Sequence, residues 1–284
     1  MQLKTALAIA GSDPSGGAGI QADLKTFTML GVYSGAVITC HTVQNTTGVA
    51  SYHPVDEELV EQQIMAVLED LVVSHIKIGM VGSKEIAAAI GAALDNFQGE
   101  VIWDPVLRAS SGQLLTDAAG ATDILEILAK RVTVLTPNLP ELAALTQKNI
   151  IGTEEMRDAA LYLLDRFKNI RTVLVKGGHK EKENDAVTDY LVRRRKDVDA
   201  TSSTSYEVFS ETHPRIATKN DHGTGCTFAS AFTAFHLLTD SELTAFTKTS
   251  AFMHELLQLS APYEIGRGRG PLLHYLACRP PTSA

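Results

Sequence analysis

A cysteine at the end of a glycine-rich segment offers both an anion site and a base. Residues 219–227 read KNDHGTGCT and run into an apolar stretch with helical spacing, which predicts a buried helix beginning near Gly225. The free N–H groups and the positive dipole end of that helix favour phosphate, and a thiol placed there has a lowered pKa. The pattern indicates phosphoryl transfer to a hydroxyl group, with Cys226 as the base. The alternative is a buried structural cysteine after an ordinary glycine turn.

The bulk properties describe an ordinary globular chain. It has 284 residues, of which 44% are hydrophobic and 20% charged, and its net charge of −8 gives no support to a nucleic-acid or membrane-surface role. The apolar run near the N-terminus is too short for a signal peptide or a membrane span. Three cysteines (Cys40, Cys226 and Cys278) show no metal-type spacing. We therefore expect a reduced, cytoplasmic protein without a membrane or nucleic-acid partner.

Predicted strands and helices alternate along the chain, which is typical of an α/β fold with a mostly parallel sheet covered by helices on both faces. The expected strands are 5–10, 36–40, 75–79, 101–103, 132–135 and 172–175, followed by a hairpin of 186–192 and 206–209. The expected helices are 20–30, 56–71, 83–97, 116–130, 139–145, 153–167, one from 225 onward, and 242–259. Residues 41–55 are polar and rich in turn formers. We expect a single domain over 1–284, with a disordered tail from about residue 277.

Polar clusters follow several of the predicted strands. In such sheets ligands bind beyond the carboxyl ends of the strands, and the clusters there are 11–19, 104–105, 136–141 and 176–178. Residues 17–22 match a loosened dinucleotide fingerprint but lack the acidic residue about twenty positions on, and no P-loop motif is present. A thiol hydrolase using a distant histidine stays open but is less favoured beside a phosphate-type turn. The basic run at 193–196 is interpreted as a solvated hairpin tip.

Taken together, these segments resemble hydroxymethylpyrimidine/phosphomethylpyrimidine kinases, which are thiamine-biosynthesis enzymes of the ribokinase-like superfamily. The resemblance covers nearly the whole chain in the family's order. Each motif alone is weak, but the ordered set is highly specific. The motifs that carry it are 10–26, 44–46, 77–80, 104–106, 136–141, 175–179, 222–227 and 266–271.

The resemblance implies a ribokinase-like three-layer α/β/α sandwich. It implies ATP-dependent phosphorylation of the hydroxymethyl group of 4-amino-5-hydroxymethyl-2-methylpyrimidine and, as an open question, of its monophosphate. It also implies Mg²⁺, a monovalent cation as a further candidate, and a homodimer. The wider superfamily usually has Asp where Cys226 stands, whereas the pyrimidine kinases and some related pyridoxal kinases have Cys.

The resemblance assigns roles to individual residues. The catalytic set is Cys226 as general base with Gly223, Thr224 and Gly225 as amide donors to the transferring phosphate. The expected substrate contacts are Gln44, Asp23, Gly11, Met80 and Val106. The expected ATP contacts are Lys176, Gly177, Gly178 and Thr224, and the expected Mg²⁺ site comprises Asp104, Asn138 and Glu141. Structural alternatives stay open for several of these residues. They are a turn-capping Gln44, an Asp23 that satisfies the glycine-rich loop, Met80 and Val106 as ordinary core, a strand-end surface Lys176, and a Glu141 that complements a helix dipole.

Two other functions remain to be weighed. A pyridoxal kinase would phosphorylate an aromatic hydroxymethyl substrate of similar shape. A catalytically silent ligand-binding protein could use the same scaffold, although the presence of Cys226, Glu141 and Lys176 together argues against it.

Overall fold

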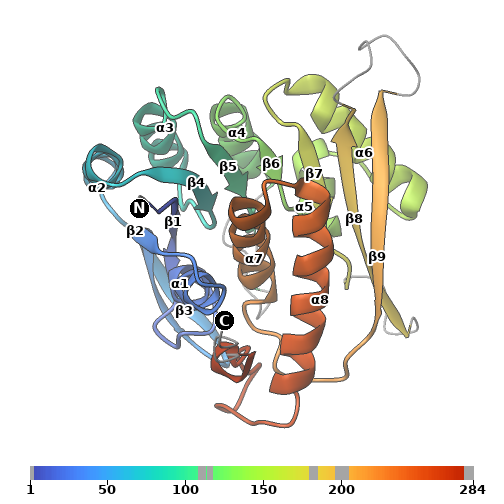
Figure 1. The fold of residues 1–284 in the computed structure, drawn as a ribbon. Coiled ribbons are helices and arrows are strands. Elements are labelled where there is room, and N and C mark those ends of the chain that lie inside the picture. The colour runs from blue at the N-terminus through green and yellow to red at the C-terminus, as the bar shows by residue number, and fades with distance from the viewer. Residues whose placement is uncertain (1–2, 108–112, 114–117, 179–184, 196–204, 278–284) are drawn as a thin grey trace.

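In the described part of the chain, nine strands form one mixed sheet at the centre of the molecule (Figure 1). The structure is a computed structural model that describes residues 3–107, 113, 118–178, 185–195 and 205–277. The strand order is β3-β2-β1-β4-β5-β6-β7-β8-β9. Pairing is parallel from β2 through β7 and antiparallel for β2–β3, β7–β8 and β8–β9. The strands are β1 (Thr5–Ser12), β2 (Ser34–Asn45), β3 (Gly48–Pro54), β4 (Val73–Ile78), β5 (Glu100–Trp103), β6 (Val134–Leu135), β7 (Thr172–Val175), β8 (Ala186–Arg194) and β9 (Tyr206–Pro214).

Helices cover both faces of this sheet, which confirms the predicted three-layer α/β/α architecture. The helices are α1 (Gly19–Met29), α2 (Glu57–Asp70), α3 (Lys84–Ala93), α4 (Ala118–Leu128), α5 (Leu139–Thr146), α6 (Thr153–Arg166), α7 (Thr224–Thr239) and α8 (Glu242–Ser260), with a 3₁₀ turn, η1 (His274–Ala277). Among the described residues, no helix combines the length and hydropathy needed to cross a membrane.

The alternation of side chains along β1 divides the core into two layers. Leu7 and Ile9 pack in the large apolar cluster on the side of α2 to α6. Ala6, Ala8 and Ala10 face the opposite side, toward α1 and α7. Successive residues of a strand point to opposite faces, so a strand buried on both faces is apolar throughout. The small alanine side chains allow α1 to pack closely over β1, with Ala234 of α7 in the same cluster.

Helix starts follow the expected capping chemistry. The Leu59 amide donates to the side chain of Asp56 at 3.1 Å, and the Ile86 amide donates to Ser83 Oγ at 3.2 Å. These contacts satisfy amide groups that have no intrahelical partner. The predicted starts of α2 and α3 at these residues are therefore confirmed. The predicted start of α4 at residues 116–117 and the predicted disordered tail from 278 onward lie outside the described residues.

The expectation of a turn-rich loop over residues 41–55 was wrong. β2 continues to Asn45 and pairs with β3 as an antiparallel hairpin at one edge of the sheet. Much of this hairpin faces solvent, with only Val49 of β3 buried, so the apolar alternation that marks a strand is missing. The Asn45 side chain closes the turn by accepting from the amide and hydroxyl groups of Thr47 at 2.8 and 2.6 Å. As a consequence, Gln44 is held on a strand and not on a loop.

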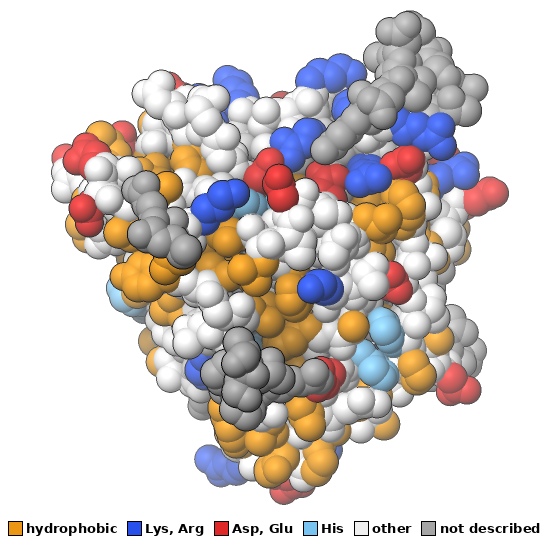
Figure 2. Space-filling model, viewed as in Figure 1, with side chains coloured by type: hydrophobic (Ala, Val, Ile, Leu, Met, Phe, Trp, Pro, Cys, Tyr) orange, Lys and Arg blue, Asp and Glu red, His pale blue; other side chains and the backbone are white. Residues whose placement is uncertain are grey.

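The basic run at the end of β8 is largely paired with acidic side chains. Arg193 contacts Glu207 at 2.8 Å and Glu242 at 3.6 Å, and Arg195 contacts Glu207 at 3.6 Å. Side chains of both signs gather near this end of the β8–β9 hairpin (Figure 2). The described part of the run therefore does not form an unopposed basic patch. Lys196 lies outside the described residues.

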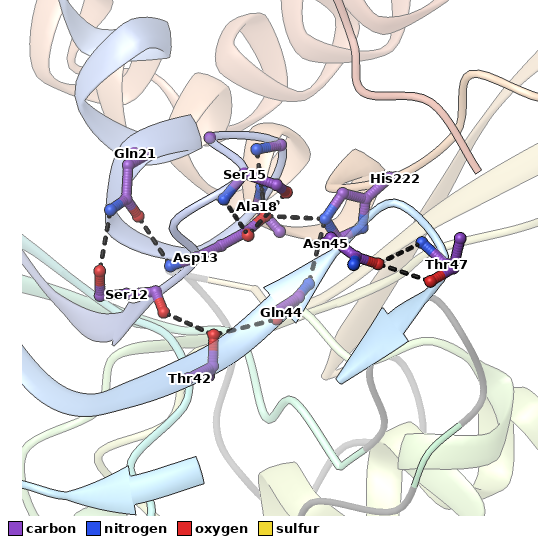
Figure 3. A network of polar contacts seen from close by, with 12 residues as sticks. Ser12, Asp13, Ser15, Ala18, Gln21, Thr42, Gln44, Asn45, Thr47 and His222 are labelled. Atoms are coloured by element: carbon purple, nitrogen blue, oxygen red, sulfur yellow. Dashed lines mark hydrogen bonds and ion pairs between the residues drawn. The ribbon is translucent and has the colours of Figure 1, made fainter. Parts of the chain in front are cut away.

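The loop between β1 and α1 is organised by one buried carboxylate, that of Asp13 (Figure 3). Oδ1 accepts from the amide and hydroxyl groups of Ser15 at 2.9 and 2.7 Å. Oδ2 accepts from the amides of Gly17 and Ala18 at 3.0 and 2.9 Å, and from His222 Nε2 at 2.8 Å. Burial alone would raise the pKa of Asp13, but the hydrogen bonds from His222 and Ser15 lower it to about 2. Asp13 thus joins this loop to the segment that enters α7.

Asp13→Asn should destabilise the fold in a pH-dependent way. Because the folded pKa of about 2 lies below the ordinary value of 3.8, the carboxylate stabilises the folded state above pH 4. That contribution, on the order of 2 kcal/mol, is lost as the pH falls toward 2. Urea unfolding of both proteins over a pH series should show the largest difference near neutral pH and a smaller one below pH 4. The exposed Asp158 provides the control, since Asp158→Asn should leave the curve unchanged. A difference that is constant with pH would contradict the assignment.

Candidate active site

A cavity of about 1160 Å³ lies beyond the carboxyl ends of the parallel strands. Every residue predicted for the site lines it, with the exception of Asp23. The predicted residues on its wall are Gly11, Gln44, Met80, Asp104, Val106, Asn138, Glu141, Lys176, Gly177, Gly178, Gly223, Thr224, Gly225 and Cys226. The loops after β1, β4, β5, β6 and β7 supply part of this wall, as expected for an open parallel sheet. The rest comes from β2, β8, the segment after β9, the segment that enters α7, and α8.

The first turn of α7 forms part of this wall. Its N-cap residue is Gly223, with φ +82°, and a Cβ at this position would lie 1.9 Å from the carbonyl oxygen of Gly17. Only glycine allows this conformation and this close approach. The N-cap therefore offers no side chain to the amides of the first turn, and such amides have no intrahelical acceptor. The turn presents them, with the dipole of a 16-residue helix, at the edge of the cavity.

Cys226 lies in this turn and is partly exposed to the cavity. The predicted fall in its pKa was wrong for the ligand-free protein. Burial of the thiol raises its pKa to about 11, while the charge of Lys77 and a hydrogen bond from the Gly19 backbone lower it and nearby carboxylates raise it. The helix terminus alone therefore does not yield a thiolate, because the surrounding protein atoms replace water around the sulfur atom.

Gln44 reaches the cavity from β2 and is held by two neighbours (Figure 3). Its amide lies 3.1 Å from His222 Nε2 and 3.3 Å from Thr42 Oγ1. His222 Nε2 is also 2.8 Å from the ionised carboxylate of Asp13, so this nitrogen carries a proton and donates it. In the structure Gln44 Nε2 faces His222 and Gln44 Oε1 faces Thr42 (Figure 3). Because His222 Nε2 donates to Asp13 and the Thr42 hydroxyl donates to Ser12 O at 2.8 Å, the reversed orientation of the amide satisfies both neighbours better.

A lysine lies between two acidic residues deeper in the cavity. Lys176 Nζ contacts Asp104 Oδ1 closely and lies 3.6 Å from Glu141 Oε2. Burial would lower the pKa of Lys176, but the two carboxylates raise it, so the ammonium group keeps its charge. Burial raises the pKa of Glu141, with Asp104 acting in the same direction and Lys176 opposing it. A Cβ on Gly225 would lie 3.3 Å from Lys176 Nζ, which places the start of α7 beside this cluster.

Asn138 and Glu141 also cap α5. Asn138 Oδ1 accepts from the Glu141 amide at 2.8 Å, and Glu141 Oε2 accepts from the Asn138 amide at 2.7 Å. This reciprocal pair is a capping box. The cap leaves Asn138 Oδ1 a second lone pair, so it is compatible with the predicted role in which Asn138 and Glu141 position Mg²⁺ through water. Glu141 Oε2 therefore also has the structural role at the helix N-terminus that was the alternative to metal binding.

The carboxylates of Asp104 and Glu141 nevertheless fit a magnesium ion. Asp104 Oδ2 is buried on the cavity side without a hydrogen-bond partner. Mg²⁺ retains several waters and needs only one or two carboxylates beside substrate phosphates. Within the described part of the chain, no group of three or more His, Cys, Asp or Glu side chains forms a metal site. The two carboxylates present therefore suit an ion that arrives with phosphate.

The remaining part of the cavity is wide and partly apolar. Phe228, Met253 and Leu257 line it together with His213 and His254, whose rings stack with their centroids 4.9 Å apart. Gly177 and Gly178, which lead into this part of the cavity, differ in the space around the position of a Cβ atom. A Cβ on Gly177 would lie 2.4 Å from the carbonyl oxygen of Thr188, so packing against β8 requires this glycine. Gly178, with φ +89° and no atom near its missing Cβ, leaves open space.

The prediction that Asp23 contacts substrate was wrong. Its side chain is fully buried between α1, β4 and α7 and is not among the described residues that line the cavity. Lys77 Nζ donates to its two oxygens at 2.8 and 2.9 Å, and Ser230 Oγ donates to Oδ1 at 2.7 Å. These contacts leave no access for a ligand.

Sequence reasoning had not assigned roles to Asp13, His222 or Lys77. Asp13 is followed by Pro14 and Ser15, a turn-forming combination in which Asp accepts from nearby amides, and this signal could have identified it as the anchor of the loop. His222 and Lys77 had no such local signal, because their partners are far away in the sequence.

Comparisons with known proteins identify the family of this chain. The family model for phosphomethylpyrimidine kinase matches residues 13–273. The hydroxymethylpyrimidine/phosphomethylpyrimidine kinase of Rhizobium meliloti (strain 1021) is 40% identical over 271 residues, which cover 95% of this chain and 96% of that protein.

Two solved structures extend the comparison. The phosphomethylpyrimidine kinase of Clostridium difficile 630 is 33% identical, with a TM-score of 0.73 over 89% of this chain and 99% of that one. The pyridoxal kinase of Staphylococcus aureus in complex with AMP-PCP and pyridoxal is 28% identical, with a TM-score of 0.80 over 96% and 94% of the two chains. On the strength of the family match and of 40% identity over nearly the full length, the chain belongs to the phosphomethylpyrimidine kinase family.

Proposed function

We propose that this protein is an ATP-dependent kinase that phosphorylates the hydroxymethyl group of 4-amino-5-hydroxymethyl-2-methylpyrimidine and then its monophosphate. One observation carries the proposal. The segment that enters α7 runs from His222, which contacts Gln44, to Gly225, which lies beside Lys176 and Asp104. The amide terminus and the thiol of Cys226 therefore lie between a hydrogen-bonding surface for a ring and a charged surface for phosphate.

The pyrimidine would lie at the Gln44 side of the cavity. The Gln44 amide offers both a donor and an acceptor, which suits an aminopyrimidine edge. Gly11, Met80 and Val106 line the cavity beside it and provide apolar surface, with Gly11 packed against the Met80 sulfur atom. The adenine ring would occupy the wide part of the cavity between His213, His254 and the apolar residues of α7 and α8.

The transfer itself needs a base and an anion site. The Cys226 thiolate takes the proton from the substrate hydroxyl as that oxygen attacks the γ-phosphate, and the bond between the γ-phosphorus and the ADP oxygen breaks. The amides of Gly223, Thr224, Gly225 and Cys226 receive the charge of the transferring group. Lys176 and Gly178 lie where they can contact ATP.

Asp104 and Glu141 would hold Mg²⁺, which supplies positive charge to the phosphates when it is bound. A monovalent cation, a homodimer and a cytoplasmic location stay predictions from the family resemblance and the sequence.

The direct test is a coupled assay of ADP formation with Mg²⁺ and ATP. Hydroxymethylpyrimidine, its monophosphate and pyridoxal are compared at equal concentrations with the purified full chain. We expect turnover with both pyrimidines and little with pyridoxal. Preference for pyridoxal would retain the mechanism but change the substrate. The similarity to the Staphylococcus aureus pyridoxal kinase is the reason for testing pyridoxal. Absence of turnover with all three would support a silent ligand-binding protein.

Cys226→Ala should reduce kcat about 10²- to 10⁴-fold, the usual range for the loss of a general base. Because burial raises the pKa of Cys226 to about 11, the fraction of thiolate increases with pH. The kcat/KM of the wild type should therefore rise toward alkaline pH, and this rise should be absent from the variant. Cys40→Ala, at a buried cysteine outside the cavity lining, is the matched control. Near-normal turnover in Cys226→Ala would exclude its role as base.

Glu141→Gln should increase the Mg²⁺ concentration needed for half-maximal rate by roughly 10- to 100-fold, the range seen when groups that support a metal site are lost. The control is Glu154→Gln, which alters an exposed acid in the first turn of α6. A Mg²⁺ titration measured at saturating ATP distinguishes the two. An unchanged titration combined with lower thermal stability would show that Glu141 only caps α5.

A further inference from the structure

Lys77 and Asp23 form a fully buried ion pair that the proposed reaction leaves without a role. Both side chains have 0% exposure, and neither is among the described residues that line the cavity. Removing two charges from water offsets most of their attraction, so a buried pair is a weak source of stability, and apolar residues can often replace it. The location of the pair, beneath the first turns of α7, suggests a different reason for it.

Two contacts connect α1 and α7 at matching positions. At the start of α1, the Gly19 backbone lies close enough to the Cys226 thiol to lower its pKa. Four residues later, Asp23 Oδ1 accepts from Ser230 Oγ at 2.7 Å. Cys226 and Ser230 are also four residues apart, and residues at this spacing share one face of a helix. Asp23 therefore lies one helical turn away from the Cys226 thiol.

The side chain of Lys77 approaches the region between Asp23 and Cys226 from the sheet. On β4, His75 faces α7, where its Nε2 lies 2.9 Å from His236 Nδ1. Lys77, two residues further along the strand, points to the same side. A Cβ on Gly79 would lie 2.8 Å from Lys77 Nζ, and the next residue, Met80, lines the cavity. The ammonium group thus lies directly behind the cavity wall.

The charges that act on the Cys226 thiol come from three directions. Lys77 from β4 is the charge that most lowers its pKa, in opposition to burial, while Asp23 of α1 and Asp104 after β5 raise it. Lys176 after β7 also interacts with the thiol, but its effect on the pKa of Cys226 is smaller than that of Lys77. Lys77 is therefore the positive charge that acts most strongly on the sulfur atom.

We propose that Lys77 is a positioning residue that acts on the reaction through Cys226. Its ammonium group lies behind the cavity wall and stabilises the Cys226 thiolate. Asp23 holds the ammonium group in place, and Ser230 holds Asp23. The inference rests on the proposed role of Cys226 as base. Before each transfer the thiol releases its proton to water. The sulfur atom then takes the proton of the substrate hydroxyl, so the ammonium group stays protonated throughout.

The experiment measures the ionisation of Cys226 directly. Ligand-free full-length protein is treated with iodoacetamide over a pH series, and alkylation of the Cys226 peptide is followed by mass spectrometry. The thiolate is the reactive species. Lys77→Met/Asp23→Asn removes both charges and keeps an acceptor for Ser230. Its rate at pH 8 should fall several-fold, because Lys77 lowers the pKa of Cys226 more than Asp23 raises it.

Two further variants make the result decisive. Thr233→Val alters a buried side chain of α7 whose hydroxyl donates only to Ala229 O, and it should leave the alkylation rate unchanged. If Lys77→Met/Asp23→Asn does not fold, Lys77→Met/Asp23→Leu replaces the pair with apolar side chains, a change that buried pairs often tolerate.

An unchanged alkylation profile in a folded double variant would overturn the proposal. The alkaline rise in kcat/KM should also move to higher pH in the double variant and not in Thr233→Val. Alkylation needs neither ATP nor substrate, so it reports on Lys77 even if Cys226→Ala proves active and the role of Cys226 as base is rejected.

Discussion

The close contact between two glycine-rich segments is the constraint on which the site depends. Gly223 lies so close to Gly17 that a side chain at either position would collide with the other segment. The Asp13 carboxylate secures this contact, because it accepts from three amides of its own loop and from His222 of the other segment. The position of the first turn of α7 relative to Gln44 is therefore determined by a single buried carboxylate and not by the packing of α7 on the sheet alone.

The charges around Cys226 follow from the same arrangement. Lys77 pairs with Asp23 on one side of the cysteine, and Lys176 pairs with Asp104 and Glu141 on the other. The second group has more carboxylates than cations, so it has room for an added positive ion, whereas the first group is balanced. This asymmetry explains why a metal ion and phosphate would enter on the Lys176 side, since the two charges on the Lys77 side already balance each other.

The sequence predicted the layers of the fold and the edge at which the site lies, because both depend on local patterns. Short apolar runs marked the buried strands, and polar clusters marked the ends of those strands. The β2–β3 hairpin escaped detection, since an exposed edge strand has no apolar alternation. The role of Asp23 could not be read from α1, because its partner Lys77 is 54 residues away. In each case the missing information was tertiary.

The error over the pKa of Cys226 has the same origin, and it also explains why a thiol suits this position. A helix terminus favours a thiolate, but enclosure by protein atoms opposes it, and enclosure is stronger here. A carboxylate in place of the thiol would add a permanent negative charge beside Asp23 and Asp104, in a cavity that must also admit the phosphates of ATP. A thiol whose pKa is raised to about 11 is neutral at rest and adds no such repulsion. The disadvantage of a thiol with a raised pKa is that only a small fraction of the protein molecules have Cys226 in its thiolate form at neutral pH. A fixed ammonium group behind the wall reduces that disadvantage without exposing a second cation to the nucleotide.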